Sequence, residues 1–246
     1  MLSATPLVLC VEVMKTIIID YRIDAESINK LTDIGFNVIK TIPVKNLYEA
    51  VNGHPDMQLH CIGKNTIICA EEVYEYYKEQ LPESYNLICG KTALKDKYPY
   101  DILYNAAVIG SLVICNEKYT ADEILEAHKC AGRKIINVKQ GYAKCSTAVV
   151  NERAAITADE GIYKALTENN IDALKINPGS IKLETMSYGF IGGCCGLIDD
   201  KTLAFNGNID KHPQRKLIKD FCISHRINIL CLNDKELYDI GTIMCI

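Results

Sequence analysis

The chain has 246 residues, 48% of which are hydrophobic, and its formal net charge is −4. This hydrophobic content is sufficient for one large core, and no Gly/Ser-rich or Pro-rich linker divides the sequence, so a single domain is predicted. The basic residues are dispersed, which argues against a dedicated DNA-binding protein. No uncharged apolar run reaches the length of about 18 residues that a membrane span requires.

Residues 1–13 are apolar but lack the basic segment that begins a secretory signal. We interpret them as an optional N-terminal extension, because Met14 directly precedes the first predicted strand, residues 17–20. The domain is therefore expected to span residues 14–246, and deletion through Val13 is expected to leave it folded. Most of the 12 cysteines lie in apolar runs, where free thiols pack as small hydrophobes. We predict a cytoplasmic protein without disulfides, structural zinc or another cofactor.

Apolar runs and amphipathic segments alternate along the rest of the chain. Apolar residues recur at three and four positions in the segments that we predict as helices: residues 25–34, 70–80, 121–131, 159–169 and 213–225. Short Val- and Ile-rich runs between them predict strands: residues 36–42, 58–62, 106–115, 134–138, 148–150, 174–176 and 227–232. The alternation is typical of an α/β fold.

The helices begin in a repeated way. The sequence TADE opens two of them, at Thr120–Glu123 and Thr157–Glu160; weaker copies occur at 24–26 and 69–72, and residues 196–205 open a fifth unit. Repetition at this scale indicates an architecture built from equal parts. We predict five strand-strand-helix-strand units. Each helix should cover one face of its small sheet while the other face turns to a common centre, which gives a five-bladed α/β-propeller around a channel.

Polar residues alternate at the start of the second unit. If the strand reaches back to His54, then His54, Asp56, Gln58 and His60 share the face that turns to the channel. Two imidazoles and a carboxylate are also a possible set of ligands for a divalent metal, but Pro55 disrupts the strand beside the first of them. We therefore predict a hydrogen-bonding pocket wall and no metal.

A second polar segment precedes the last helix. Asn206 and His212 are expected to line the channel mouth opposite His54, although an Asp210-capped turn before Pro213 explains the same residues structurally.

The glycine-rich run 191–196 suggests a close backbone approach, either to a ligand or between blades. Gly193 and Cys194 are therefore candidate ligand contacts. Lys144, Ser146 and Tyr188 complete the predicted pocket, since each is the polar member of a strand edge near the same end.

Several segments resemble the pentein superfamily, an α/β-propeller of five ββαβ units. The resemblance is carried by the five-unit plan and by the segments Ile109–Asn116 (IGSLVICN) and Cys145–Thr157 (CSTAVVNERAAIT). The superfamily includes arginine deiminase, dimethylarginine dimethylaminohydrolase, amidinotransferases and a non-enzymatic ribosome anti-association factor. Closer still is the similarity to an uncharacterised bacterial pentein-like family, through Tyr188–Gly196 (YGFIGGCCG), the pairs at 206–207 and 212–213, and a terminal DIGTI at 239–243.

The resemblance implies roles for three residues. In the guanidine-modifying members, a C-terminal cysteine attacks the guanidinium carbon, a histidine moves protons and carboxylates hold the guanidinium. It implies Cys245 as nucleophile, Asp56 as the guanidinium clamp and His54, or else His60, as a displaced proton carrier. The chain departs from this pattern in the fourth unit, where residues 141–144 contain no histidine.

Two hypotheses follow. We favour a protein that binds a small polar molecule, of which a guanidine compound is one candidate, in its channel without the standard catalytic histidine. The alternative is a guanidine-modifying hydrolase or amidinotransferase that uses Cys245. A protein- or ribosome-interacting ring is a third reading, supported by the fold resemblance alone.

Overall fold

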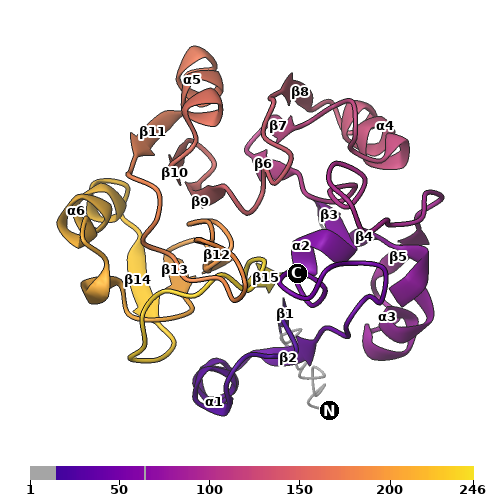
Figure 1. Ribbon diagram of the computed structural model, residues 1–246, viewed down its shortest axis with the longest axis horizontal. Helices are drawn as coiled ribbons and strands as arrows, with labels where there is room; N and C mark the ends of the chain where they lie inside the picture. Colours follow the sequence, from indigo (N-terminus) through magenta and orange to yellow (C-terminus); the bar gives the residue numbers. More distant parts are fainter. Residues whose placement is uncertain (1–14, 64) are drawn as a thin grey trace, which may run out of the picture.

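Five three-stranded sheets stand around a common centre in the computed structural model, which describes residues 15–63 and 65–246. The longer helices lie at the periphery, whereas the short helix at residues 55–58 and the C-terminus lie near the centre (Figure 1). The predicted ββαβ units are confirmed, and we number them 1 to 5 in chain order.

Unit 1 takes its strands from both ends of the chain. It contains β15 (Met244–Cys245), β1 (Thr16–Ile19), α1 (Ala25–Asp33) and β2 (Asn37–Lys40). Unit 2 contains β3 (Leu59–Gly63), β4 (Thr66–Cys69), the short 3-10 turn η1 (Glu71–Val73), α3 (Tyr74–Gln80) and β5 (Asn86–Cys89). Between them lies the single-turn helix α2 (Pro55–Gln58).

The other three units follow the same order. Unit 3 contains β6 (Ala107–Ile109), β7 (Leu112–Cys115), α4 (Asp122–Cys130) and β8 (Lys134–Asn137). Unit 4 contains β9 (Thr147–Asn151), β10 (Ala154–Thr157), α5 (Glu160–Glu168) and β11 (Asp172–Lys175). Unit 5 contains β12 (Cys195–Asp199), β13 (Thr202–Phe205), η2 (Ile209–Lys211), α6 (Arg215–Ser224) and β14 (Asn228–Cys231).

Each unit pairs its first two strands antiparallel and returns through its helix to a parallel third strand. The acidic residues noted at the helix starts account for the helix boundaries in two units. Asp24 accepts the N–H of Ser27 at the start of α1, and Asp159 accepts the N–H of Ile162 at the start of α5. Such N-caps satisfy backbone donors that a helix leaves unpaired.

The ring is closed by the two ends of the described chain. Strand β15 pairs antiparallel with β1, with Ile17 opposite Cys245 and Ile18 opposite Met244. Ile240 and Ile243, just before β15, are buried in a core cluster with Ile17 and Ile19. This pairing covers an edge of unit 1 that would otherwise be open.

Three details differ from the sequence prediction. The predicted strand 106–115 is a hairpin, β6 and β7, which turns at Gly110 with a φ of 55°. The chain before β3 is the helix α2 rather than an extension of the strand, because Pro55 is a good first residue of a helix and a poor residue of a strand. Strands β4, β5, β10 and β15 have no counterpart among the predicted strands.

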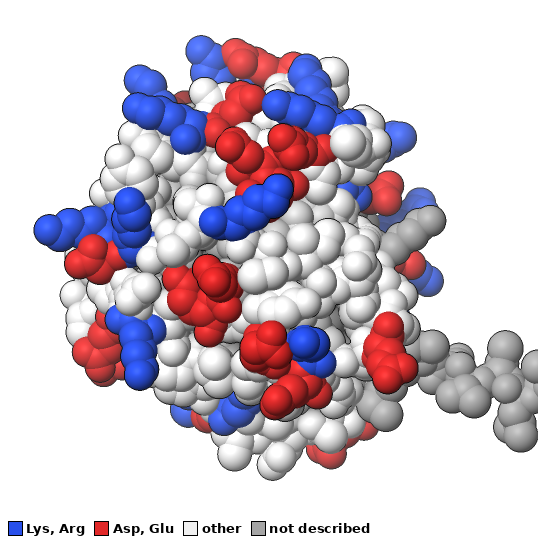
Figure 2. Space-filling view, turned by 90° about the vertical axis from the view of Figure 1, so that its right-hand side faces the viewer, with Lys and Arg blue, Asp and Glu red and all other residues white. Residues whose placement is uncertain are grey.

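The described surface is polar and mixed in charge. Figure 2 shows Lys and Arg interspersed with Asp and Glu over one face, without a field of a single sign. None of the helices in the described ranges has the length and apolar character needed to cross a membrane. All cysteines within these ranges are free thiols.

Candidate functional site

The central channel contains a pocket of about 240 Å³. Strands β3, β6, β9, β12 and β15 each contribute to its wall, and most of that wall is apolar. Its polar groups are Asp56, His60, Lys144 and Thr242. We call this space the channel pocket. A small number of polar groups in an apolar cavity is the usual composition of a small-molecule site.

Asp56 is the buried carboxyl group of this pocket. It lies in the single turn of α2, is 1% exposed, and its Oδ2 accepts a hydrogen bond from Cys145 Sγ at 2.8 Å. Its Oδ1 has no partner among the described residues. Burial raises the pKa of Asp56 to about 7, because the charged form loses its hydration.

His54 lies beside Asp56 and is completely buried. Neither of its ring nitrogens has a hydrogen-bond partner in the described part of the chain, and its Nδ1 is 3.9 Å from Asp239 Oδ1. Donor atoms of His54, Asp56 and Cys145 all lie within 4.8 Å of one another. We call these three residues the buried cluster. Their nitrogen, oxygen and sulfur atoms lie close together, so the three side chains can bind a metal ion or exchange a proton.

Cys145 is held in place by Asn105. The Oδ1 of Asn105 accepts the N–H of Lys144 at 2.8 Å and that of Cys145 at 3.3 Å, while its Nδ2 donates to Cys145 Sγ at 3.3 Å. Burial and the neighbouring Asp56 carboxyl raise the pKa of the Cys145 thiol well above its ordinary value. The sulfur is therefore a protonated donor to Asp56 rather than a thiolate.

Lys144 brings a positive charge to the same end of the pocket. Its Nζ donates to Thr242 Oγ1 at 2.7 Å and to the carbonyl of Gly192 at 3.4 Å. Thr242 in turn donates to the carbonyl of Cys195 at 2.9 Å, and its backbone has a φ of 86°. This left-handed conformation, costly for a β-branched residue, directs the end of the chain into the site.

Gly193 connects the parts of the site through its backbone. Its N–H donates to the carbonyl of Cys145 at 2.9 Å, and its carbonyl accepts the N–H groups of Ile240 and Thr242 at 3.0 and 2.8 Å. A Cβ at this position would stand 1.9 Å from Asp239 Oδ1. The predicted close approach of the Gly193 backbone is therefore present. Its neighbours are protein atoms of Cys145, Asp239 and the segment 240–242.

Cys245 also lines the channel pocket. Its Sγ donates to the carbonyl of Ile198 at 3.3 Å, and burial raises the pKa of its thiol. Two residues, Ile243 and Met244, separate it from Thr242, so the two Cα atoms are up to about 10 Å apart along an extended chain. The thiol that contacts Asp56 is Cys145, not Cys245.

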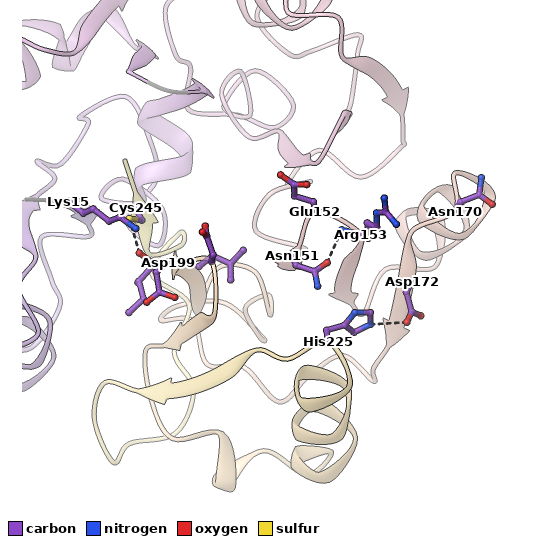
Figure 3. A pocket seen from close by; sticks show the side chains of 12 residues that line it. Lys15, Asn151, Glu152, Arg153, Asn170, Asp172, Asp199, His225 and Cys245 are labelled. Carbon is purple, nitrogen blue, oxygen red and sulfur yellow. Dashed lines mark hydrogen bonds and ion pairs between the residues drawn. The ribbon is translucent and has the colours of Figure 1, made fainter. Parts of the chain in front are cut away.

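Cys245 also faces a wider hollow of about 920 Å³, which we call the basin. Figure 3 shows it beside Lys15 and Asp199, across the basin from Arg153 and His225. Because Cys245 and Leu197 line both spaces, the channel pocket adjoins the basin at this end.

The predicted common face of His54, Asp56, Gln58 and His60 is wrong, because α2 replaces the strand. The Nε2 of Gln58 donates to the carbonyls of Ile42 and Asn52. The Nδ1 of His60 is 3.2 Å from the carbonyl oxygen of Tyr104, and the Nε2 of His60 is 2.7 Å from the Nε2 of His128. Of these four residues, only His54 and Asp56 belong to the buried cluster.

The remaining predicted ligand contacts do not line the channel pocket. Ser146 is buried, and its hydroxyl has no partner among the described residues. Cys194 donates to the carbonyl of Ile191, and His212 accepts the N–H of Gln214. Asn206 and Asn233 line a separate hollow. The ring of Tyr188 packs edge-on against that of Phe190, and Tyr188 is 39% exposed.

Sequence reasoning missed four residues of the site: Asn105, Cys145, Asp239 and Thr242. Three of them, Cys145, Asp239 and Thr242, lie in the segments 145–157 and 239–243, which resemble other sequences. That resemblance could have pointed to them. No sequence pattern pointed to Asn105.

The imidazole pair predicts a loss of stability in acid. Burial, together with the charges of the His128 ring and Arg133, lowers the pKa of His60 to about 3, and burial together with Arg133 lowers that of His128 to about 4. The unfolded chain, with histidine pKa values of about 6.5, binds more protons below that pH. We therefore expect the free energy of unfolding to fall from about pH 6.5 towards pH 4, by up to about 1.4 kcal/mol per pH unit for each histidine.

Urea unfolding at several pH values measures this slope. The variant His128→Gln should have a shallower slope than the unsubstituted protein, because it removes one titrating group. Identical slopes over this range would contradict the assignment.

The five ββαβ units around a channel define a protein of the pentein fold, and solved structures share it. A dimethylarginine dimethylaminohydrolase in an adduct with S-methyl-L-thiocitrulline is 11% identical, with 89% of this chain and 93% of that chain covered and a TM-score of 0.56. The enzyme from Pseudomonas aeruginosa in complex with citrulline is 10% identical, with coverages of 90% and 93% and a TM-score of 0.55. SxtG, an amidinotransferase from Microseira wollei in the saxitoxin biosynthetic pathway, is 11% identical, with coverages of 84% and 72% and a TM-score of 0.53.

Residues 18–244 match the model of a family of unknown function, DUF6873, and the chain belongs to this family. No curated protein sequence matches it. At 10–11% identity the solved structures show the shared fold.

Proposed function

We propose that this protein binds a small polar molecule in the channel pocket. The observation that carries the proposal is the convergence of the Asp56 carboxyl, the Lys144 ammonium and the Thr242 hydroxyl at one end of a mostly apolar cavity. Asp56 Oδ1 is buried without a hydrogen-bond partner in the described part of the protein, and a ligand donor would supply one. The pocket volume of about 240 Å³ limits the ligand to a small molecule.

The ligand class that fits this end is a guanidine compound carrying a carboxylate. A guanidinium group pairs with Asp56 through charge-assisted hydrogen bonds, and a carboxylate pairs with Lys144. The solved relatives give this class further support, since their bound compounds are citrulline and S-methyl-L-thiocitrulline.

Calorimetric titration with arginine, agmatine and citrulline tests both contacts separately. Asp56→Asn is expected to weaken the binding of arginine and of agmatine by about 10- to 100-fold, because each guanidinium loses a charged hydrogen-bond partner. Citrulline, whose side chain is neutral, should change far less. Lys144→Met should weaken the binding of arginine but not that of agmatine, because agmatine has no carboxylate.

Asp210→Asn is the matched control, because Asp210 is exposed and distant in sequence from the site. Absence of binding by all three compounds, or equal losses for agmatine and citrulline in Asp56→Asn, would contradict the proposal.

One observation favours a second candidate, a guanidine-modifying enzyme. Asp56, His54 and the Cys145 thiol are adjacent, so a proton from Cys145 has two nearby acceptors and the resulting thiolate is a nucleophile. An assay for ureido product and ammonia distinguishes the thiols. Turnover lost in Cys145→Ser alone assigns the reaction to Cys145, and turnover lost in Cys245→Ser alone assigns it to Cys245. No turnover with any guanidine supports the binding role.

A further inference from the structure

We propose that the buried cluster, His54, Asp56 and Cys145, is a binding site for a divalent transition metal, of which zinc is the best fit. This goes beyond the binding of an organic ligand. The three donors are the imidazole, carboxylate and thiol groups that zinc prefers in proteins. Among the residues that the structure describes, they form the one such group of three or more whose donor atoms lie within 4.8 Å of one another.

The polar atoms of the cluster are otherwise unaccounted for. Both ring nitrogens of His54 and Oδ1 of Asp56 are buried without hydrogen-bond partners among the described residues. Buried polar atoms without partners lose their hydration without compensation, so several of them side by side require an explanation. A metal ion bonded to these donors provides it.

The geometry is close to that of a metal site. Ligand atoms around tetrahedral zinc lie about 3.5 Å apart, since zinc–ligand bonds measure about 2.0–2.3 Å. The donors of the cluster are at most 4.8 Å apart, so small side-chain rotations bring them to this spacing. The contact of 2.8 Å between Cys145 Sγ and Asp56 Oδ2 must lengthen, because both atoms would then face the ion.

Charge and proton balance favour a zinc-like ion over calcium or magnesium. Binding breaks the S–H bond of Cys145 and, where the Asp56 carboxyl is protonated, its O–H bond; the metal–thiolate and metal–carboxylate bonds form, and the released protons go to solvent. The thiolate and the Asp56 carboxylate together neutralise the two positive charges of the ion. Thiolate is a soft ligand that selects zinc and similar metals, whereas calcium and magnesium prefer oxygen alone.

Asp239 supplies the support that a metal-binding histidine usually has. Its Oδ1 is 3.9 Å from His54 Nδ1, and its two oxygens accept the N–H groups of Gly241 and Phe190 at 2.9 and 2.8 Å. The gap of 3.9 Å is longer than a hydrogen bond, but a small rotation of the ring would bring Nδ1–H to this fixed carboxylate and leave Nε2 for the metal. Asp239 is thus a positioning residue.

Cobalt is the probe for this site, because Co²⁺ bound by a thiolate has a charge-transfer absorption in the near ultraviolet. We expect metal-free full-length protein to develop this band at one Co²⁺ per chain and to lose it when Zn²⁺ is added. Cys145→Ser should abolish the band, and Asp239→Asn should weaken Co²⁺ binding by about 10- to 100-fold.

Cys130→Ser is the matched control, because Cys130 is an exposed thiol and its loss should leave the band unchanged. Circular dichroism of each variant verifies that it is folded. The proposal is overturned if no band develops, if the band persists in folded Cys145→Ser, or if Cys130→Ser removes it. The titration contains no organic ligand, so its failure leaves the proposed guanidine binding unaffected, and the reverse holds as well.

Discussion

Removal of residues 240–246 is expected to prevent cooperative folding of this protein. The deletion removes β15, the partner of β1, and with it the backbone hydrogen bonds that close the ring. It also removes Ile240 and Ile243, which are 3% and 2% exposed. Burial of each such side chain contributes about 1.5–3 kcal/mol. Because a domain is stable by only about 5–15 kcal/mol, these losses consume most of its stability.

Thermal unfolding followed by circular dichroism measures the effect. Deletion of Ile246 alone is the matched control, since it preserves the pairing of Ile17 with Cys245 and both buried isoleucines. We expect this shorter deletion to retain a cooperative transition. A cooperative transition of unchanged midpoint after loss of all seven residues would show that the closing strand is dispensable.

Gly193→Ala is expected to destabilise the protein by about 3 kcal/mol or more, at or beyond the upper end of overpacking effects. The added methyl group would stand 1.9 Å from Asp239 Oδ1. Asp239 cannot move away easily, because it is 1% exposed and its oxygens accept two backbone N–H groups. Any shift of Gly193 instead displaces Cys145 and Thr242, which bond to its backbone.

Urea unfolding of Gly193→Ala measures this cost, with Gly161→Ala as the control. Gly161 is exposed in helix α5, where a Cβ would meet only the Asp159 carboxylate at 3.2 Å. Alanine there should change stability by no more than about 1 kcal/mol, since it is a better helix former. Equal effects of the two substitutions would show that the contact with Asp239 relaxes freely.

The repeated architecture could be predicted because it is written in local patterns. Apolar spacing located α1, α4, α5 and α6, and acidic residues such as Asp24 and Asp159 marked helix starts because they cap them. The hairpin at Gly110 and the turn α2 were harder. A β-branched run looks the same whether it is one strand or two, and a polar alternation of four residues fits a helix turn as well as a strand.

The candidate site could be predicted only in part. Asp56 and His54 were expected together and are adjacent. Cys145 was singled out only as part of a segment that resembles the pentein superfamily. The choice between it and Cys245 depends on which thiol reaches Asp56, and Cys145 Sγ is 2.8 Å from Asp56 Oδ2 although 89 positions of sequence separate the two residues. Asn105, which holds Cys145, gave no local signal.

The sequence by itself therefore determined the five-unit plan and the position of its main helices, because these depend on periodicity, capping and turn chemistry within about 10–15 neighbouring residues. Only the tertiary structure decided which polar groups meet. Ring closure brings together α2, the segment before unit 4 and the segment before β15. Burial there raises the pKa of Asp56 and leaves the ring nitrogens of His54 without hydrogen-bond partners among the residues that the structure describes. Both properties arise from surroundings that are contributed by distant parts of the chain.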